Sequence, residues 1–338
     1  MVKRADGRWQ ETVHLPGMDK PKYFYGKTKA EIKKKIIEWE LQQESKENFA
    51  AVAEEWWDIH APKIAHNTTK SYAPALKRAQ EYFGDTPVST IKPVDISRFI
   101  KQFARKGFAQ KTVKTQLLVV SLICSYAVER GYCDYNVARD IKVPDGLSKK
   151  KVTAPTSDDI SRVKASTNCM FGMFAYWLLY TGMRRGELLA LDWSDVDVKK
   201  RIIHVRRSLY YVGNAPEVKE PKTKTSTGSI PLLDALLNVI TPRNSGLVFP
   251  DPQTGTYITN KRFCTLWRKY QEESGVSATP HQFRHAFATM LFEAGIPAEK
   301  AQIILRHAQV STTMDIYRDI RAEKMAELYK DVYSVDIA

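Results

Sequence analysis

The pattern of apolar residues changes twice along this 338-residue chain, and the two changes limit which folds it can adopt. Residues 1–46 open with short aromatic stretches of strand character, residues 47–146 keep a helical period, and residues 152–338 combine both kinds of element. Pro144-Asp145-Gly146 and the basic run Lys149–Lys151 interrupt the period at the second change, as a linker would. We therefore predict a multidomain α+β protein with three domains at these boundaries.

The first predicted domain is a small three-stranded sheet packed against one helix. Asp6-Gly7 is a strong hairpin signal, followed by the alternating stretch Arg8–Leu15 and a second aromatic run at Tyr23–Tyr25. Thr28 and Glu31 have the spacing of a capping box, which predicts the start of a helix. The apolar face of that helix would comprise Ile32, Ile36 and Trp39.

The second predicted domain is entirely helical. Its amphipathic stretches are Phe49–Trp57, Ser71–Phe83, Ile96–Phe103 and Thr112–Glu129. Four residues that the pattern places between the helices have side chains of the kind that hold a helix on a phosphate backbone. They are Lys70, Lys111, Thr112 and Lys114. We interpret them as candidate DNA contacts, with ordinary solvated helix ends as the alternative.

The third predicted domain is mainly helical and contains a small antiparallel sheet. It begins near Val152 and includes the strongly apolar run Met170–Tyr180. Strands are expected around Arg201–Tyr211 and Lys224–Pro231, and helices follow from Lys261 onward.

The charge of the chain favours a polyanionic partner. Its 52 Lys and Arg residues exceed its 38 Asp and Glu residues, which makes the formal net charge +14. Each phosphate that a basic side chain neutralises releases condensed counterions, so nucleic acid is the first partner to consider and an anionic membrane the second. Residues 1–35 alone carry ten Lys or Arg against four Asp or Glu. The exposed face of the first sheet is therefore a candidate DNA surface, with a merely solubilising surface as the alternative.

Neither a disulfide framework nor an export signal is predicted. The four cysteines are scattered without a CxxC pair or a histidine at ligand spacing, so we interpret them as reduced. The N-terminus lacks the apolar core of a secretory signal, and no segment approaches about 18 uninterrupted apolar residues. The sequence therefore predicts a soluble cytoplasmic protein without a membrane partner.

Four short motifs in the third domain combine cationic residues with one tyrosine. They are Thr181–Leu188 (TGMRRGEL), Pro221–Lys224 (PKTK), His281–His285 (HQFRH) and Leu305–His307 (LRH), the last followed ten residues later by Tyr317. Singly, each has a structural explanation, such as a helix C-cap at Gly182 or a surface cation at Arg184. Together they suit a phosphodiester, because in-line attack on phosphorus gathers negative charge on the non-bridging oxygens. Arg184 and Arg284 are suited to hold those oxygens through bidentate hydrogen bonds.

A histidine accompanies the second arginine of this set. His281 and Arg284 stand three residues apart on a helix predicted to begin after Pro280, so both side chains can reach one phosphate together. A metal bound by the histidines of these motifs is the competing interpretation, but the neighbouring arginines would repel a divalent ion. We expect neither a metal nor a cofactor.

Tyr317 is the predicted nucleophile. An unperturbed phenol has a pKa near 10, so only about one in a thousand is ionised at neutral pH. A pocket of Arg, Lys and His side chains would lower the pKa of Tyr317, and His281 is a candidate to take its proton. The leaving 5′-oxygen would need a proton donor, for which Lys222 is the first candidate and Lys224 the second, with a solvated hairpin surface as the alternative. A covalent phosphotyrosine would keep the energy of the broken diester, so that rejoining would need no ATP.

These motifs resemble the signature of the tyrosine recombinase (phage integrase) family, and the resemblance extends over nearly the whole chain. That signature is an Arg after Thr-Gly-Met or Thr-Gly-Leu, a Lys on a β-hairpin, His-x-x-Arg, a second His in a Leu-Gly-His-like turn, and a Tyr soon after it. By this match the catalytic positions are Arg184, Lys222, His281, Arg284, His307 and Tyr317. Glu187 matches the usual acidic position and would be a structural partner within the fold.

Two residues depart from the pattern of the family. Arg306 stands where Gly is usual before the second His, and we expect it to add a phosphate contact or to tilt that turn. Gly228 occupies a hairpin position that is often an Arg. Neither departure removes a catalytic side chain, so we expect activity to survive both.

The resemblance also implies a division of labour between the domains. Residues 1–46 would bind arm-type DNA sites, residues 47–146 would form a SAM-like core-binding domain, and residues 152–338 would be catalytic. Family members clamp double-stranded DNA and act as a homotetramer through a Holliday junction. This layout implies the integrase of a phage or conjugative element, with a host DNA-bending protein and a directionality factor as accessory partners. The segment after Tyr317 would dock on a neighbouring protomer, with helical packing in its own subunit as the alternative.

Other functions remain open from the sequence. A regulator with the same fold could bind DNA without cutting it, although an intact set of six residues argues against this. A type IB-like topoisomerase would use the same chemistry, but the N-terminal sheet and the helical block suit site-specific assembly better. A metal-dependent nuclease would need a cluster of carboxylates that these motifs lack.

Overall fold

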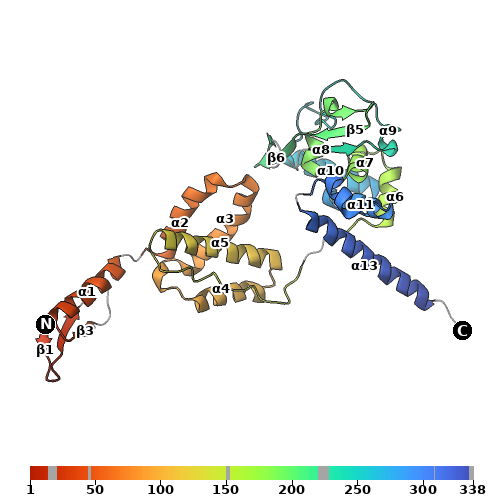
Figure 1. Ribbon diagram of the computed structural model, residues 1–338. Coiled ribbons are helices and arrows are strands. Elements are labelled where there is room, and N and C mark those ends of the chain that lie inside the picture. Colours follow the sequence, from red (N-terminus) through yellow and green to blue (C-terminus); the bar gives the residue numbers. More distant parts are fainter. Residues whose placement is uncertain (14–20, 45–46, 150–152, 220–227, 308, 335–338) are drawn as a thin grey trace. The chain divides into compact units, whose positions relative to one another are not determined.

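The structure is a computed structural model that describes residues 1–13, 21–44, 47–149, 153–219, 228–307 and 309–334. The chain divides into two compact units, residues 1–150 and 151–338 (Figure 1). The first unit contains two separate hydrophobic cores, one under an N-terminal sheet and one inside a group of helices. The motifs with Arg184, Arg284 and Tyr317 all belong to the second unit.

The N-terminal part is an antiparallel sheet with strand order β1-β2-β3, which confirms the three predicted strands. The elements are β1 (Val2–Lys3), β2 (Trp9–Val13), β3 (Lys22–Gly26) and α1 (Lys29–Glu44). Phe24 of β3 and Ile32 of α1 are buried together. Tyr23 and Tyr25, which alternate with Phe24 along the strand, are exposed. The sheet therefore buries one face against α1 and presents the other to solvent.

The start of α1 differs in one detail from the predicted capping box. The Thr28 hydroxyl accepts a hydrogen bond from the Glu31 N–H at 3.1 Å, as expected, but the Glu31 carboxylate accepts from the N–H of Lys27 at 2.8 Å. The reciprocal bond of a capping box would come from Thr28 itself. The side chain of Trp39, predicted for the apolar face of this helix, lies outside the described residues.

A group of helices follows the sheet along the chain, in agreement with the predicted fold class. Its helices are α2 (Phe49–His60), α3 (His66–Phe83), α4 (Pro93–Arg105) and α5 (Gln110–Glu129). Helix α5 contacts each of the other three. It is also the one helix in the described part of the chain that is long and apolar enough to cross a membrane. Val113, Val120 and Ile123 of α5 are fully buried in the core of this helical group, so the apolar composition is accounted for by packing.

Lys70, Lys111, Thr112 and Lys114 lie on helices, so their predicted placement between helices is wrong. Helix α3 begins at His66 rather than near Ser71, and α5 begins at Gln110. The first turns contain threonines and an asparagine, which have low helix propensity and no apolar period, so the sequence pattern places the helix starts too late. The three lysines are exposed close to the starts of α3 and α5.

The second unit begins with helices and continues with two small antiparallel sheets, in agreement with the predicted fold class. The helices are α6 (Ser157–Ala165), α7 (Gly172–Thr181) and α8 (Arg185–Leu189). One sheet has the order β4-β5-β8, from Val196–Asp197, Ile202–Val205 and Gly228–Pro231. The other pairs β6 (Ser208–Val212) with β7 (Ala215–Lys219). The expected strand region 201–211 thus supplies one strand to each sheet.

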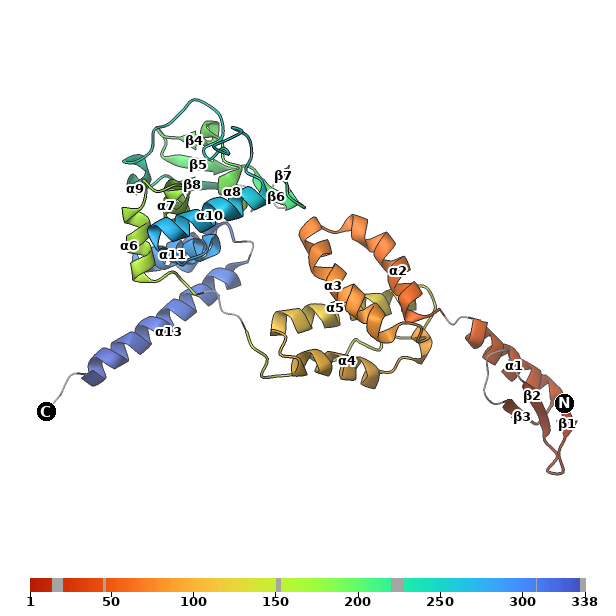
Figure 2. The same ribbon diagram turned by 180° about the vertical axis from the view of Figure 1, so that it is seen from behind.

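The chain ends in helices, as predicted. They are α9 (Asp234–Leu237), α10 (Asn260–Ser274), α11 (Pro280–Glu293), α12 (Ala298–Leu305) and α13 (Val310–Ser334). Figures 1 and 2 both show α6, α7, α10 and α11 gathered together with β5 beside them, and Figure 2 also shows β8 next to β5. Phe174, Trp177 and Leu178 of α7 are fully or almost fully buried at the centre of this unit. The end of α7 therefore lies on a rigid core, and the first arginine motif follows it directly.

Candidate active site

The turn after α7 positions Arg184. The Thr181 hydroxyl donates to the carbonyl of Trp177 at 2.6 Å and accepts from the N–H of Met183 at 3.2 Å, so it closes the helix end. Gly182 has a φ of +60°, and a Cβ there would lie 2.4 Å from Cδ1 of Phe287. Both its backbone conformation and its surroundings therefore require glycine. The Thr-Gly-Met-Arg motif is a compact turn that places Arg184 at the N-cap of α8.

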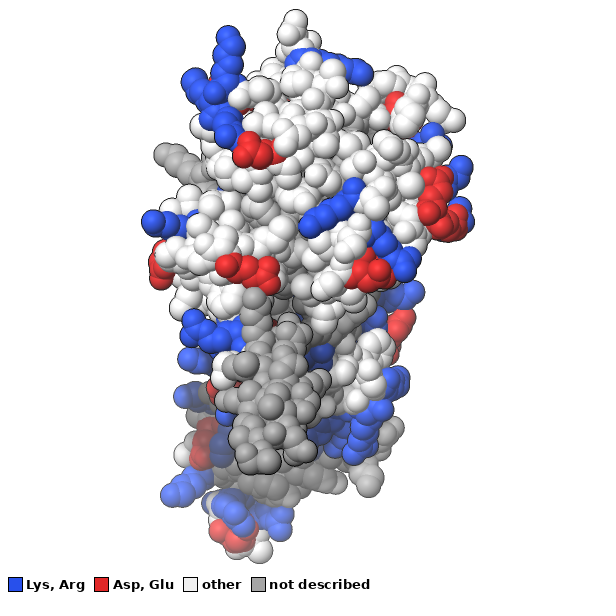
Figure 3. Space-filling model, turned by 90° about the vertical axis from the view of Figure 1, so that its right-hand side faces the viewer, with Lys and Arg blue, Asp and Glu red and all other residues white. Residues whose placement is uncertain are grey.

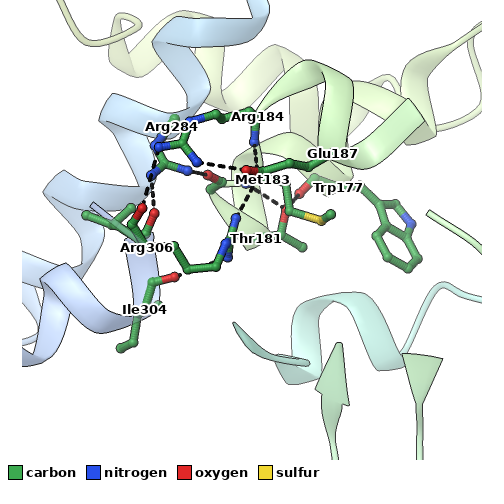
Figure 4. A network of polar contacts seen from close by, with 10 residues as sticks. Trp177, Thr181, Met183, Arg184, Glu187, Arg284, Ile304 and Arg306 are labelled. Carbon is green, nitrogen blue, oxygen red and sulfur yellow. Dashed lines mark hydrogen bonds and ion pairs between the residues drawn. The ribbon is translucent and has the colours of Figure 1, made fainter. Parts of the chain in front are cut away.

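Glu187 joins two arginines that are distant in sequence. Its Oε1 accepts from Nη1 of Arg184 at 2.7 Å, and its Oε2 accepts from Nη2 of Arg306 at 2.6 Å and from the N–H of Arg184 at 2.9 Å. Figure 4 shows the two guanidiniums meeting at this carboxylate. Burial alone would raise the pKa of Glu187, but Arg306 and Arg184 hold it below its ordinary value. Glu187 is therefore an ionised, buried anchor for both guanidiniums.

Arg284 is buried and links three parts of the site. It lies on α11, and its guanidinium donates to the carbonyl of Gly182 at 2.8 Å and to the carbonyl of Leu305. Burial, and then the positive charge of Arg184, lower the pKa of Arg284 to about 9. At neutral pH it remains charged. It holds the end of α7 and the end of α12 against α11.

His281 occupies the first turn of α11, as predicted from Pro280. Thr279 and Gln282 form a capping box at this helix start. Burial of the ring, and then the charges of Arg284 and Arg184, lower the pKa of His281. A neutral imidazole at physiological pH is the form in which His281 can accept a proton.

His307 follows the end of α12 and is 9% exposed. Its Nδ1 is 2.8 Å from the hydroxyl oxygen of Thr313, a fully buried residue that sequence reasoning did not single out. Burial, and then the charge of Arg284, lower the pKa of His307 to about 4. The hydrogen bond to Thr313 orients the ring, and the second ring nitrogen is left for another partner.

Protonation of these histidines should make the stability of the protein depend on pH. The pKa of His307 falls from 6.5 to about 4 on folding, so the unfolded chain binds more protons between these two values. The contribution of the neutral ring to the free energy of unfolding is thus complete above about pH 6.5 and is lost as the pH falls toward 4. Urea unfolding from pH 7.5 to 4.5 should show this decline, and His307→Asn should make it shallower. An equally steep decline in the variant would contradict the assignment.

The conformation of Tyr317 differs from the prediction. Its hydroxyl donates to the carbonyl of Ile296 at 3.1 Å, and its ring meets that of Phe292 at a centroid distance of 5.1 Å. Tyr317, Phe292 and Ile296 line a cavity of about 420 Å³, whose other walls come from the start of α12 and from α13. Burial raises the pKa of Tyr317, whereas a surrounding cationic pocket was expected to lower it. The predicted lowering of the Tyr317 pKa is therefore not found in this conformation, because burial raises it and no cationic side chain among the described residues offsets that effect.

The other predicted site residues have different outcomes. Lys222 and Lys224 lie outside the described residues. Within the described ranges, no three His, Cys, Asp or Glu side chains are grouped as metal ligands would be. Arg306, for which a phosphate contact or a tilted turn was expected, is 3% exposed and bonded to Glu187.

Comparison with known proteins identifies the family. The phage integrase family matches residues 151–324, and the phage integrase central domain matches residues 49–143. The first match alone spans half of the chain, so the chain belongs to the phage integrase family, the tyrosine-type site-specific recombinases. The predicted resemblance is thereby confirmed.

Individual relatives are distant in sequence but alike over most of their length. The tyrosine recombinase XerC-like protein of Caldanaerobacter subterraneus subsp. tengcongensis is 24% identical over 346 residues, with 88% of each chain covered. The integrase of transposon Tn1549, in complex with transposon right-end DNA, has a TM-score of 0.67 at 20% identity and covers 84% of this chain and 100% of its own. A lambda integrase tetramer bound to a Holliday junction gives a TM-score of 0.58 at 17% identity, covering 91% and 95%. These similarities confirm the fold.

Proposed function

We propose that this chain is the integrase of a phage or conjugative element, which cuts and rejoins double-stranded DNA through a 3′-phosphotyrosine at Tyr317. The observation that carries the proposal is the cluster of Arg184, Arg284 and Arg306 around a single carboxylate, Glu187. Three guanidiniums against one buried anion leave an excess of positive charge. Such an excess suits the non-bridging oxygens of a phosphodiester in the transition state.

Each side chain has a distinct part in the proposed reaction. The Tyr317 oxygen attacks phosphorus while its proton passes to His281, and the bond from phosphorus to the 5′-oxygen breaks. Arg184, whose side chain is 42% exposed, contacts the non-bridging oxygens together with Arg284 and His307. Lys222 supplies a proton to the leaving 5′-oxygen. Rejoining runs the same steps in reverse and needs neither ATP nor metal.

The conformation of Tyr317 implies a rearrangement before attack. Its hydroxyl must leave the Ile296 carbonyl, which it contacts at 3.1 Å, before it can reach a phosphate held by Arg184. Leaving this partly buried position also removes the cause of its raised pKa. DNA binding would supply the free energy for this step.

We further propose the three-part organisation of residues 1–46, 47–146 and 152–338 for binding arm sites, binding core sites and catalysis. The exposed face of the first sheet supports it, because Tyr25 is 39% exposed there beside Arg4, whose guanidinium lies 5.5 Å from the ring centroid. Exposed lysines at the starts of α3 and α5 are proposed core-site contacts. The protein would act in the cytoplasm as a tetramer on DNA, with a host DNA-bending protein and a directionality factor.

DNA binding should weaken steeply with salt. On the face shown in Figure 3, Lys and Arg side chains are interspersed with Asp and Glu rather than gathered in one patch. Bound DNA would therefore contact only some of these basic side chains. If about seven phosphates are contacted, a plot of log affinity against log salt should have a slope of roughly −6. Fluorescence anisotropy with a duplex between 50 and 200 mM salt measures it, and a flat response would refute the electrostatic argument.

A suicide substrate tests the proposed chemistry. A duplex nicked close to a candidate core site loses a short fragment after cleavage, so the covalent intermediate cannot reverse. We expect a denaturant-resistant adduct in the presence of chelator, with the DNA 3′-phosphate on the peptide that contains Tyr317. An adduct on another residue would refute the mechanism. DNA binding without any adduct would instead support the catalytically inactive regulator.

A further inference from the structure

Arg306 adopts a strained backbone conformation, and the contacts of its side chain must compensate for that strain. It ends α12 with φ +54° and ψ +47°, in the left-handed region that L residues rarely adopt and glycine adopts freely. Its side chain is only 2% exposed and does not extend into solvent. In solvent the side chain would make no contact that could compensate for the strain. A buried guanidinium in a strained turn requires a specific partner.

That partner is the carboxylate that also holds Arg184. Nη2 of Arg306 is 2.6 Å from Oε2 of Glu187, and Nη1 of Arg184 is 2.7 Å from Oε1. The backbone carbonyl of Arg306 also accepts from Nη2 of Arg184 at 3.5 Å. Arg306 therefore constrains Arg184 twice, once through Glu187 and once through its own carbonyl. It also offsets the charge of Glu187, and lowers the pKa of this carboxyl more than Arg184 does.

Gly228 provides the space that this arrangement needs. It begins β8 opposite Val205, and it is not among the glycines with a positive φ. A Cβ at this position would lie 3.0 Å from Cδ and 3.3 Å from Cγ of Arg306. A side chain at position 228 would therefore require the stem of Arg306 to shift by a few tenths of an ångström, so this close approach, and not the backbone conformation, favours glycine.

We propose that Arg306 is a positioning residue for Arg184, acting through Glu187, and that Gly228 is its steric complement. This inference rests on the proposed function, in which Arg184 contacts the scissile phosphate. Arg306 itself is placed to hold Glu187 and does not need to touch DNA. The two departures from the family pattern, at 306 and 228, are then one paired feature.

Arg306→Met tests the positioning role, because Met keeps much of the stem and removes the charge. Strand cleavage on the suicide substrate should fall at least about tenfold, with the affinity for DNA changed less than about twofold. Without Arg306 the pKa of Glu187 should rise. As the pH is lowered, the residual cleavage rate should therefore begin to fall at a higher pH than in wild type. Arg306→Lys should restore part of the rate, since Lys restores the charge but not the planar fork. The matched control is Arg268→Met, which changes an exposed arginine of α10 that is paired with Glu272.

A double-mutant cycle tests the pairing with Gly228 independently of activity. Gly228→Ala should lower the Tm in wild type and have little effect in Arg306→Ala, which lacks Cγ and Cδ. Equal shifts in both backgrounds would overturn the steric pairing. Wild-type cleavage and pH profile in Arg306→Met, or parallel loss of folding, binding and cleavage in both Arg306→Met and Arg306→Lys, would overturn the positioning role. If the wild-type protein forms no adduct, both the proposed function and the positioning role of Arg306 fail. The double-mutant cycle, which measures Tm, would still test the steric pairing of Gly228 with Arg306.

Discussion

Tyr317→Phe is expected to abolish the covalent protein–DNA adduct completely, because no other atom of the side chain can replace the phenolic oxygen as nucleophile. Folding should survive. The Phe ring can keep its contact with Phe292 at 5.1 Å, and the variant loses only the 3.1 Å hydrogen bond to Ile296. A single hydrogen bond of this kind contributes about 1 kcal/mol to stability. Denaturing gel electrophoresis with the nicked duplex gives the readout.

The control for this variant is Tyr257→Phe, which removes the same hydroxyl from a partly buried tyrosine elsewhere in the second unit. It should form adduct at the wild-type rate. Both variants should bind the duplex as tightly as wild type, since neither changes charge. Persistence of adduct in Tyr317→Phe would show that another residue is the nucleophile.

Arg184→Ala should reduce the rate of strand cleavage by at least about a hundredfold. Loss of one donor to the developing charge on a transferred group costs roughly 3 to 4 kcal/mol of transition-state stabilisation. The fold should tolerate this change, because the buried carboxylate of Glu187 keeps its 2.6 Å ion pair with Arg306. Single-turnover cleavage of the suicide substrate, with anisotropy for binding, separates the two effects.

Arg268→Ala serves as the matched control for Arg184→Ala, because it removes the same charge from an exposed position of the second unit. Its cleavage rate should stay within about twofold of wild type, since exposed ion pairs contribute little. Unfolding of Arg184→Ala, or equal losses of binding and cleavage, would mean that Arg184 is structural.

The short-range features of the protein were predictable from its sequence. The hairpin at Asp6-Gly7, the helix start at Pro280 and the apolar helix around Trp177 depend on neighbours within a few residues, so their patterns are local. Family membership followed from the order of the motifs and is confirmed. The start of α3 was placed too late, because its first turn carries Thr68 and Thr69, whose side chains give no helical period.

Contacts between distant segments were decided only by the tertiary structure. The sequence by itself determined which side chains could bind and cleave a phosphodiester, because their chemistry depends on residue type and motif order. It did not show that Arg306 would pair with Glu187, 119 positions away, or that Tyr317 would bond to the backbone of Ile296. Burial sets the pKa of Arg284, His307 and Tyr317, and burial depends on how the helices pack. Local patterns do not encode those distances, because each pairing is fixed by the packing of the whole unit around α7.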